Sequence, residues 1–184
     1  MKTIVLGSSS ITRAQILDSF GIPFVQRHCD FDEEALRISN PSHFVYYATK
    51  GKMQSYLEKW DLDMPVLCAD TVVTADGEIL RKAKDVEDAR RILKKQSGNK
   101  VSILTCMIYK SSQYELIDLS STDYIFLPFD EVALETYLQG DDWRGKAGAC
   151  MVEGFCKKYI QEVIGFQSTA MGLCAEKLLP FLQK

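Results

Sequence analysis

The sequence predicts one α/β domain over residues 1–184, organised around a mixed β-sheet. Segments with the periodicity of strands alternate with segments with the periodicity of helices, which is typical of this fold class. In the middle of the chain, two long β segments follow one another across a short polar turn and predict an antiparallel part of the sheet. The 184 residues are 46% hydrophobic, which is enough for one sizeable core, and they contain no internal repeat or low-complexity linker.

The first elements alternate between strand and helix. Residues 3–7 predict a short buried strand, and residues 11–20 a helix that Gly21 ends. A second strand is expected over residues 22–25. Residues 40–60 begin with Asn-Pro, a favourable N-cap and first turn, and predict a long helix.

The stretch from Val66 to Lys84 is the most informative part of the chain. A run of apolar and β-branched residues predicts a strand, and a single carboxylate, Asp70, interrupts it. Asp76-Gly77 predicts a two-residue hairpin turn, because type I′ geometry needs positive φ at both positions. The acid either points to solvent from an edge strand or is buried beside a partner or a metal.

The second half of the chain continues the alternation. It first predicts a helix capped by Asp85 and ended by residues 97–99, and then strands over 101–109 and 114–127. A short helix between Asp130 and Gly140 and a loop over 140–146 follow. The chain then has a small apolar run over 147–155 interrupted by Glu153, a strand over 159–164 and a helix over 169–182. Glu153 is thus a second lone acid in a segment that looks buried.

Charge and cysteine content narrow the class of protein. The net charge of −3, without a long block of like charges, disfavours nucleic-acid binding. The six cysteines have no C-x-x-C or metal-finger spacing and mostly lie in apolar runs, so we expect small core side chains in a reducing compartment. No apolar run suits a signal peptide or a membrane span, so we expect a cytoplasmic protein without membrane contacts.

The loop between the first strand and the first helix is a candidate anion site. Gly7 is followed by three serines, and free backbone N–H groups at a helix N-terminus favour an anion. Arg13 lies in the first turn of that helix, where a cation opposes the helix dipole unless it faces a bound anion. Alternatively, Ser8 and Ser10 only cap the helix.

Two further groups of charged side chains each have two possible interpretations. Residues 32–34 are three consecutive acids, which either begin a helix or place one carboxylate beside a divalent cation. Lys52 lies near the apolar face of the 40–60 helix, from which its ammonium group either extends to water or reaches an anion inside the protein.

Several stretches, in order along nearly the whole chain, resemble motifs of the Maf family of nucleotide pyrophosphatases. They are L-G-S-S-S-I-T-R at 6–13, C-A-D-T-V-V at 68–73, G-E-I-L-R-K-A-K-D at 77–85, Leu104-Thr105, K-A-G-A-C-M-V-E-G at 146–154 and Met171-Gly172-Leu173. No single motif is specific, but the ordered set is.

The resemblance implies a two-lobed α/β fold with a central cleft, similar to inosine-triphosphate pyrophosphatases, in a protein that is often a homodimer. It implies hydrolysis of nucleoside triphosphates to a monophosphate and pyrophosphate with Mg²⁺ or Mn²⁺. It assigns catalytic roles to Asp70, Lys52 and Lys82, with Asp70 as the proton acceptor, metal binding to Glu33 and Asp70, and substrate binding to Ser8, Ser10, Thr12, Arg13, Thr71 and Glu153.

Two departures from the family motifs bear on which nucleotide base the protein prefers. One branch that prefers pyrimidine triphosphates carries Arg and Gln where this chain has Thr12 and Glu153, and a branch acting on 7-methyl-GTP carries Trp and Glu. A glutamate suits a base that presents N–H donors, so we expect a guanine-type or modified base. A panel of triphosphates in which pyrimidines turn over fastest would refute this expectation.

A second hypothesis is a nucleotide-binding regulator of cell division or septum formation that acts through a protein partner. The departures at Thr12 and Glu153, and Gly145 in place of the family's aspartate before K-A-G, motivate it. The metal-holding acids Glu33 and Asp70 argue for the enzyme, because a binder needs them less.

Overall fold

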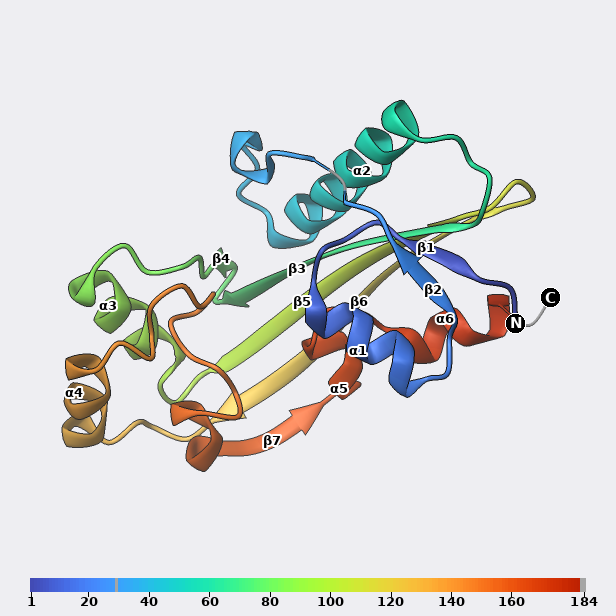
Figure 1. Cartoon of the computed structure of the whole chain (residues 1–184). Helices are drawn as coiled ribbons and strands as arrows, with labels where there is room; N and C mark the ends of the chain where they lie inside the picture. Colours follow the sequence, from blue (N-terminus) through green and yellow to red (C-terminus); the bar gives the residue numbers. More distant parts are fainter. Residues whose placement is uncertain (29, 183–184) are drawn as a thin grey trace. The chain divides into compact units, whose positions relative to one another are not determined.

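The computed structural model describes residues 1–28 and 30–182, which form two compact units (Figure 1). Unit 1 comprises Met1–Thr71, Leu104–Ser121 and the chain from Phe166 onward, and unit 2 comprises Val72–Ile103 and Thr122–Gly165. The division falls within three long strands, which therefore contribute residues to both units.

The strands form a mixed sheet, as expected. Their hydrogen-bonded order is β2-β1-β3-β5-β6-β7, and β4 pairs with β3 outside this path. β1 is parallel to β2 and β3, whereas the β3–β4 and β6–β7 pairs are antiparallel. The strands are β1 (Ile4–Leu6), β2 (Phe24–Gln26), β3 (Val66–Ala75), β4 (Glu78–Ile79), β5 (Lys100–Lys110), β6 (Glu115–Phe126) and β7 (Ile160–Ile164).

Unit 1 contains the helices α1, η1, α2, α5 and α6, with bounds Ile11–Ser19, Glu33–Ala35, Pro41–Lys59, Gln167–Ala170 and Ala175–Leu182. Local sequence signals determine where α1 and α2 begin and where α1 ends. Ser10 caps α1 and Asn40 caps α2, each accepting a bond from the backbone N–H three residues on. Gly21, with φ of +64°, follows the end of α1.

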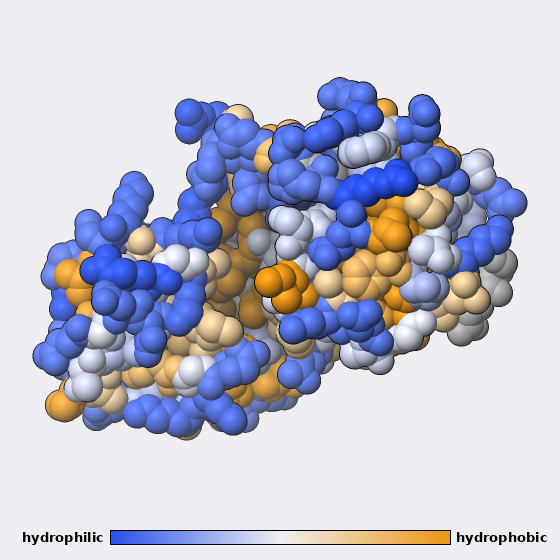
Figure 2. Space-filling view, in the orientation of Figure 1, coloured by the Kyte–Doolittle hydropathy of each residue, from blue (hydrophilic) through white to orange (hydrophobic). Residues whose placement is uncertain are grey.

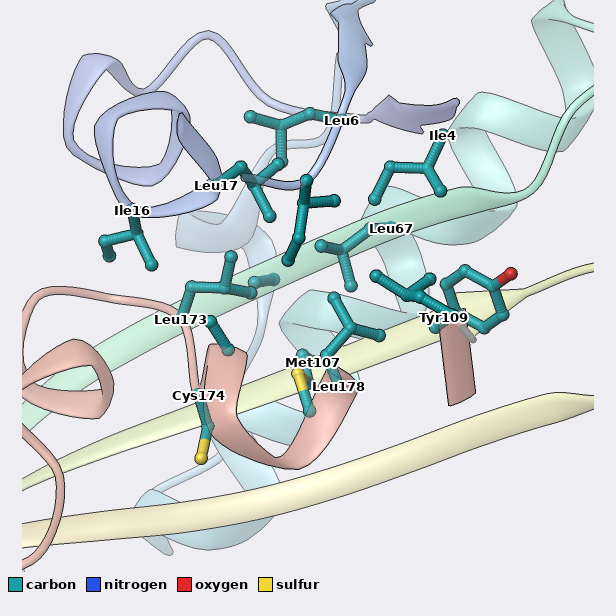
Figure 3. Close-up of a cluster of buried hydrophobic side chains, with 14 residues drawn as sticks. Ile4, Leu6, Ile16, Leu17, Leu67, Met107, Tyr109, Leu173, Cys174 and Leu178 are labelled. Carbon is teal, nitrogen blue, oxygen red and sulfur yellow. The ribbon is translucent and has the colours of Figure 1, made fainter. Parts of the chain in front are cut away.

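Strand alternation divides the core of unit 1 between two faces of the sheet. Figure 3 shows one face, where residues of β1, β3 and β5 meet α1 and the C-terminal segment; the cluster includes Ile4, Leu6, Ile16, Leu17, Leu67, Met107, Tyr109, Leu173, Cys174 and Leu178. Side chains of opposite parity pack against α2 on the other face: Val5, Val66, Cys68 and Ile108 with Met53 and Tyr56. The parity of each later strand residue therefore predicts which helix it faces.

Unit 2 contains α3 (Val86–Gln96), α4 (Glu131–Gln139) and η2 (Phe155–Tyr159). Asp85 and Asp130 cap the two α-helices as expected. Asp76 and Gly77 have φ of 50° and 75°, which confirms the predicted hairpin turn between β3 and β4.

Three sequence expectations about this architecture are wrong. The segment 169–182 is two helices, α5 and α6, separated by a turn in which Gly172 has φ of +111°. The run 147–155 is made of turns, and Glu153 is exposed there, because Gly148 and Ala149 both have positive φ and redirect the chain. The third concerns the cysteines.

Cys68, Cys106 and Cys174 are buried, as expected for core side chains. Cys150 and Cys156 instead form a disulfide bond within unit 2. The sequence interpretation missed this pair because spacing alone does not show that the intervening turns bring two cysteines together. Cys29 lies outside the described residues.

Within the described part of the chain, no helix has the length and apolar character needed to cross a bilayer. Figure 2 shows one face of the molecule, on which hydrophilic residues predominate and hydrophobic ones form smaller patches.

Candidate functional site

The loop before α1 organises Arg13. The Ser10 hydroxyl accepts the backbone N–H of Arg13 at 3.3 Å, which makes it the helix cap. The Ser8 hydroxyl accepts the backbone N–H of Ser10 at 3.2 Å and the Nη1 group of Arg13 at 3.2 Å. The two serines therefore cap the loop and helix and also fix an arginine, so the capping and anion-site interpretations are compatible.

Two other elements hold the same guanidinium group. Arg13 Nε donates to the carbonyl of Gly172 at 2.9 Å, and Nη2 donates to the Thr71 hydroxyl at 3.3 Å. A Cβ atom at Gly172 would lie 3.4 Å from both Arg13 Nε and Thr71 Oγ1. The φ of +111° favours glycine at this position, and a larger side chain would pack directly against Arg13 and Thr71.

Lys52 joins two carboxylates. Its Nζ lies 2.8 Å from Glu33 Oε2 and 2.8 Å from Asp70 Oδ1. Its side chain is only 19% exposed, so it does not extend from α2 into water. Three features that the sequence left separate, the acidic run, the strand acid and the helix-face lysine, thus meet in unit 1.

Asp70 does not point to solvent from an edge strand. β3 lies between β1 and β5 in the sheet, and Asp70 is 6% exposed. It has the parity of Val66 and Cys68, which face α2, and this parity directs its carboxylate to Lys52.

The pKa values of the two carboxyl groups are shifted in opposite directions. Burial raises the pKa of Asp70 by more than the charge and hydrogen bond of Lys52 lower it. Partial burial also opposes ionisation of Glu33, but the hydrogen bond and charge of Lys52 outweigh it, and the pKa of Glu33 is lowered. Burial lowers the pKa of Arg13 as well, against the charges of Asp70 and Glu33. Arg13 nevertheless stays protonated.

The remaining candidates divide between the units. Thr12 is the second residue of α1 and is half-buried. Lys82 and Glu153 lie in unit 2, and both are exposed. A backbone bridge joins Lys82 to Ala147, which ties the segment after β4 to the start of the turns that carry Glu153.

Sequence reasoning noted Gly172 and Thr105 only within family motifs and did not assign them, or Thr169, to the Arg13 site. Thr105 Oγ1 lies 2.9 Å from Thr71 Oγ1 and donates to the carbonyl of Thr169 at 2.7 Å. The turn signal of Gly172 and the family motif at Leu104-Thr105 were the available indications, whereas Thr169 resembles an ordinary helix residue.

Across residues 1–28 and 30–182, no group of three or more His, Cys, Asp or Glu side chains forms a protein-only metal cage. The cluster around Lys52 contains two carboxylates. Mg²⁺ is commonly held by one or two carboxylates together with water and substrate phosphates, so this donor set fits such an ion.

Comparison with known proteins gives the family. The family model described as Maf-like protein matches residues 3–184. This chain belongs to the Maf-like family. The Maf-like chain is 59% identical over 177 residues to a Nitratiruptor sp. protein named nucleoside triphosphate pyrophosphatase, covering 95% of this chain and 96% of that protein.

A Helicobacter pylori (strain J99) protein with the same name is 38% identical over 180 residues, covering 98% of the Maf-like chain and 95% of that protein. Among solved structures, the Ham1 protein of Staphylococcus aureus superposes with a TM-score of 0.51 at 10% identity, covering 99% of this chain and 98% of that one. The latter comparison confirms the expected α/β fold class alone.

Proposed function

We propose that this Maf-like protein hydrolyses nucleoside triphosphates to a nucleoside monophosphate and pyrophosphate, and that residues 1–184 act as one catalytic domain. The names of its relatives support the activity. The observation that carries the proposal is the buried Asp70 carboxylate, held by Lys52 together with Glu33 in the same unit as the Arg13 loop.

Arg13 and the N-terminus of α1 bind the triphosphate. The guanidinium group is already fixed by Ser8, Gly172 and Thr71, so little conformational freedom is lost when phosphate binds. A planar cation with several N–H donors suits phosphate oxygens. Ser10 and the first backbone N–H groups of α1 add donors to the same anion.

Glu33 and Asp70 would hold the divalent cation, Mg²⁺ or Mn²⁺, because carboxylate oxygens are the ligands that such ions prefer and both carboxylates meet at Lys52. When bound, the ion supplies positive charge that polarises the phosphoryl group and activates water.

Asp70 orients the attacking water and accepts its proton. Its raised pKa makes it a better proton acceptor than an exposed carboxylate, while Lys52 fixes its orientation. Lys52 then balances charge as the carboxylate changes protonation state. Lys82 adds a second lysine for the charge that develops on the leaving pyrophosphate.

Thr12 and Glu153 bind the base of the nucleoside, and Thr71 contributes to substrate binding through its hydrogen bond to Arg13. Glu153 is exposed, so its carboxylate can accept hydrogen bonds from base N–H groups, which favours a guanine-type or modified base. We propose this preference on the chemistry of the glutamate.

The test is product identification with a panel of canonical and modified triphosphates, each with Mg²⁺ or Mn²⁺. Release of one pyrophosphate and one monophosphate per turnover, fastest for guanine-type bases, is expected. Orthophosphate release would contradict the reaction, and faster turnover of pyrimidines would contradict the base. Nucleotide binding without any turnover would favour the regulator of cell division.

A further inference from the structure

We infer that Thr105 is a positioning residue for Arg13, acting through the hydroxyl of Thr71. The inference rests on the proposed function for its role in turnover, but the geometry that carries it is independent of the substrate. Thr105 is fully buried in β5, and its hydroxyl lies 2.9 Å from that of Thr71.

The direction of each hydrogen bond follows from counting protons. A threonine hydroxyl has one proton to donate and two lone pairs to accept with. The Thr105 proton goes to the carbonyl of Thr169, which can only accept, at 2.7 Å. Thr105 must therefore accept in its contact with Thr71, and Thr71 must donate.

This direction of donation, from Thr71 to Thr105 and from Thr105 to the carbonyl of Thr169, fixes the orientation of the Thr71 hydroxyl. Because its proton points to Thr105, its lone pairs are directed away from Thr105 and accept the Nη2 group of Arg13 at 3.3 Å. Without the acceptor at Thr105, the Thr71 proton could rotate toward Arg13, where it would oppose a guanidinium group that only donates.

Strand geometry explains why these residues meet. Thr71 has the parity of Leu67 and Ala69 on β3, and Thr105 has the parity of Met107 on β5. These positions face α1 and the C-terminal segment (Figure 3), which supply Arg13 and the carbonyl of Thr169. The row of hydroxyls therefore joins Arg13 to the turn after α5.

The turn after α5 also binds Arg13 directly. Gly172 follows Thr169 by three residues, and its carbonyl accepts Arg13 Nε at 2.9 Å. The same short segment thus fixes Nε directly and Nη2 through two hydroxyls. Two anchors on one planar group define its plane, which a single bond would not.

The test compares Thr105→Val with Thr105→Ser. Valine has nearly the shape of threonine but no hydroxyl, whereas serine retains it. We expect Thr105→Val to lower kcat about fivefold or more, the effect of one lost hydrogen bond, with a smaller change in KM. Thr105→Ser should stay within about twofold of wild type. Equal losses in both variants would overturn the inference.

Thr49→Val is the matched control. Thr49 is also fully buried in unit 1, and its hydroxyl donates to the carbonyls of Val45 at 2.8 Å and Cys106 at 3.3 Å and has no bond to Arg13 or Thr71 among those that hold the Arg13 side chain. If Thr105→Val lowers kcat no more than Thr49→Val, the effect is a general loss of packing and the inference fails. If Thr105→Val does not fold, Thr105→Cys takes its place, because a thiol forms only weak hydrogen bonds. Its kcat should be lower than that of Thr105→Ser, and equal values would contradict the inference.

Two further readouts separate positioning from structure. In a double-mutant cycle, Thr71→Val with Thr105→Val should cost no more than Thr71→Val alone, whereas additive losses would overturn the inference. In substrate-free protein, the Nη–H protons of Arg13, followed by ¹⁵N NMR and assigned with Arg13→Lys, should exchange with water about fivefold faster in Thr105→Val than in Thr49→Val, because Nη2 is the group held through Thr71. Equal rates would contradict the inference even if the wild type were inactive; a difference in an inactive protein would overturn only the proposed function.

Discussion

Asp70 and Thr71 are neighbours on β3, yet their side chains bond to different helices. Asp70 bonds to Lys52 of α2, and Thr71 accepts a bond from Arg13 of α1. The alternation of a strand makes this possible, because consecutive side chains point to opposite faces of the sheet. Two adjacent residues can thereby organise a carboxylate–lysine cluster and an arginine loop with no insertion in the strand.

Replacement of Asp70 by asparagine should not destabilise the fold at neutral pH. The folded-state pKa of Asp70 is raised by burial, so the native protein holds its proton more readily than the unfolded chain. Ionisation at neutral pH therefore costs stability, and this cost disappears at pH values low enough to protonate Asp70 in both states. Urea unfolding should give Asp70→Asn a free energy of unfolding at least equal to that of wild type at pH 7, with the difference shrinking in acid. A clear loss of stability at pH 7 would contradict the raised pKa.

Removal of Lys52 should shift the acidic limb of the pH–rate profile. Lysine lowers the pKa of both carboxyl groups, so Lys52→Met should raise both and move the loss of activity in acid to higher pH. We expect kcat at pH 7 to fall about tenfold or more because Asp70 also loses its orientation. Lys177→Met is the control, since Lys177 forms a similar 2.8 Å pair with Asp118 in unit 1. An unchanged profile in Lys52→Met would argue against Asp70 as the titrating base.

Alanine at Gly172 should impair both stability and turnover. The backbone has φ of +111°, and the new Cβ would lie 3.4 Å from Arg13 Nε and from Thr71 Oγ1. We expect a loss of about 1 kcal/mol or more in stability, with a fall in kcat. Gly21→Ala separates the two effects, because Gly21 also has positive φ but open space around it. Equal kcat in the two variants would show that the approach to Arg13 is unimportant.

Reduction of the Cys150–Cys156 bond should weaken unit 2. The two cysteines are six residues apart, and closing so short a loop contributes about 2 kcal/mol in the chain-entropy view. Denaturant unfolding of wild type should therefore respond to reductant, whereas Cys150→Ser should not. Identical unfolding midpoints of wild type with and without reductant would show that the thiols are not bonded in solution.

Local signals in the sequence predicted most elements of the fold. Asn40-Pro41 and Asp76-Gly77 act through their own backbone geometry, so they could be interpreted without knowledge of the partners. The C-terminal break could not, because the apolar pattern runs past Gly172 and the turn there is held by a distant residue, Arg13.

The same difference between local signals and contacts with distant residues applies to the candidate site. Lys52 and Asp70 were recognisable as charges in apolar surroundings, but their bond depends on how α2 packs on β3. Thr105 was noted only within a family motif, and its role was not predicted, since a threonine in a strand is ordinary until its hydroxyl is seen beside Thr71. Glu153 was misinterpreted because the turns at Gly148 and Ala149 were not recognised.

The most direct measurement of the central claim is metal-dependent pyrophosphate release by wild type beside Asp70→Asn and Asp118→Asn. Asp118 is the matched control, a carboxylate with 14% of its side chain exposed and paired with a lysine at 2.8 Å. We expect release by wild type and Asp118→Asn, and a loss of about 100-fold or more in Asp70→Asn, the usual cost of removing a general base. Comparable rates in Asp70→Asn and Asp118→Asn would contradict it.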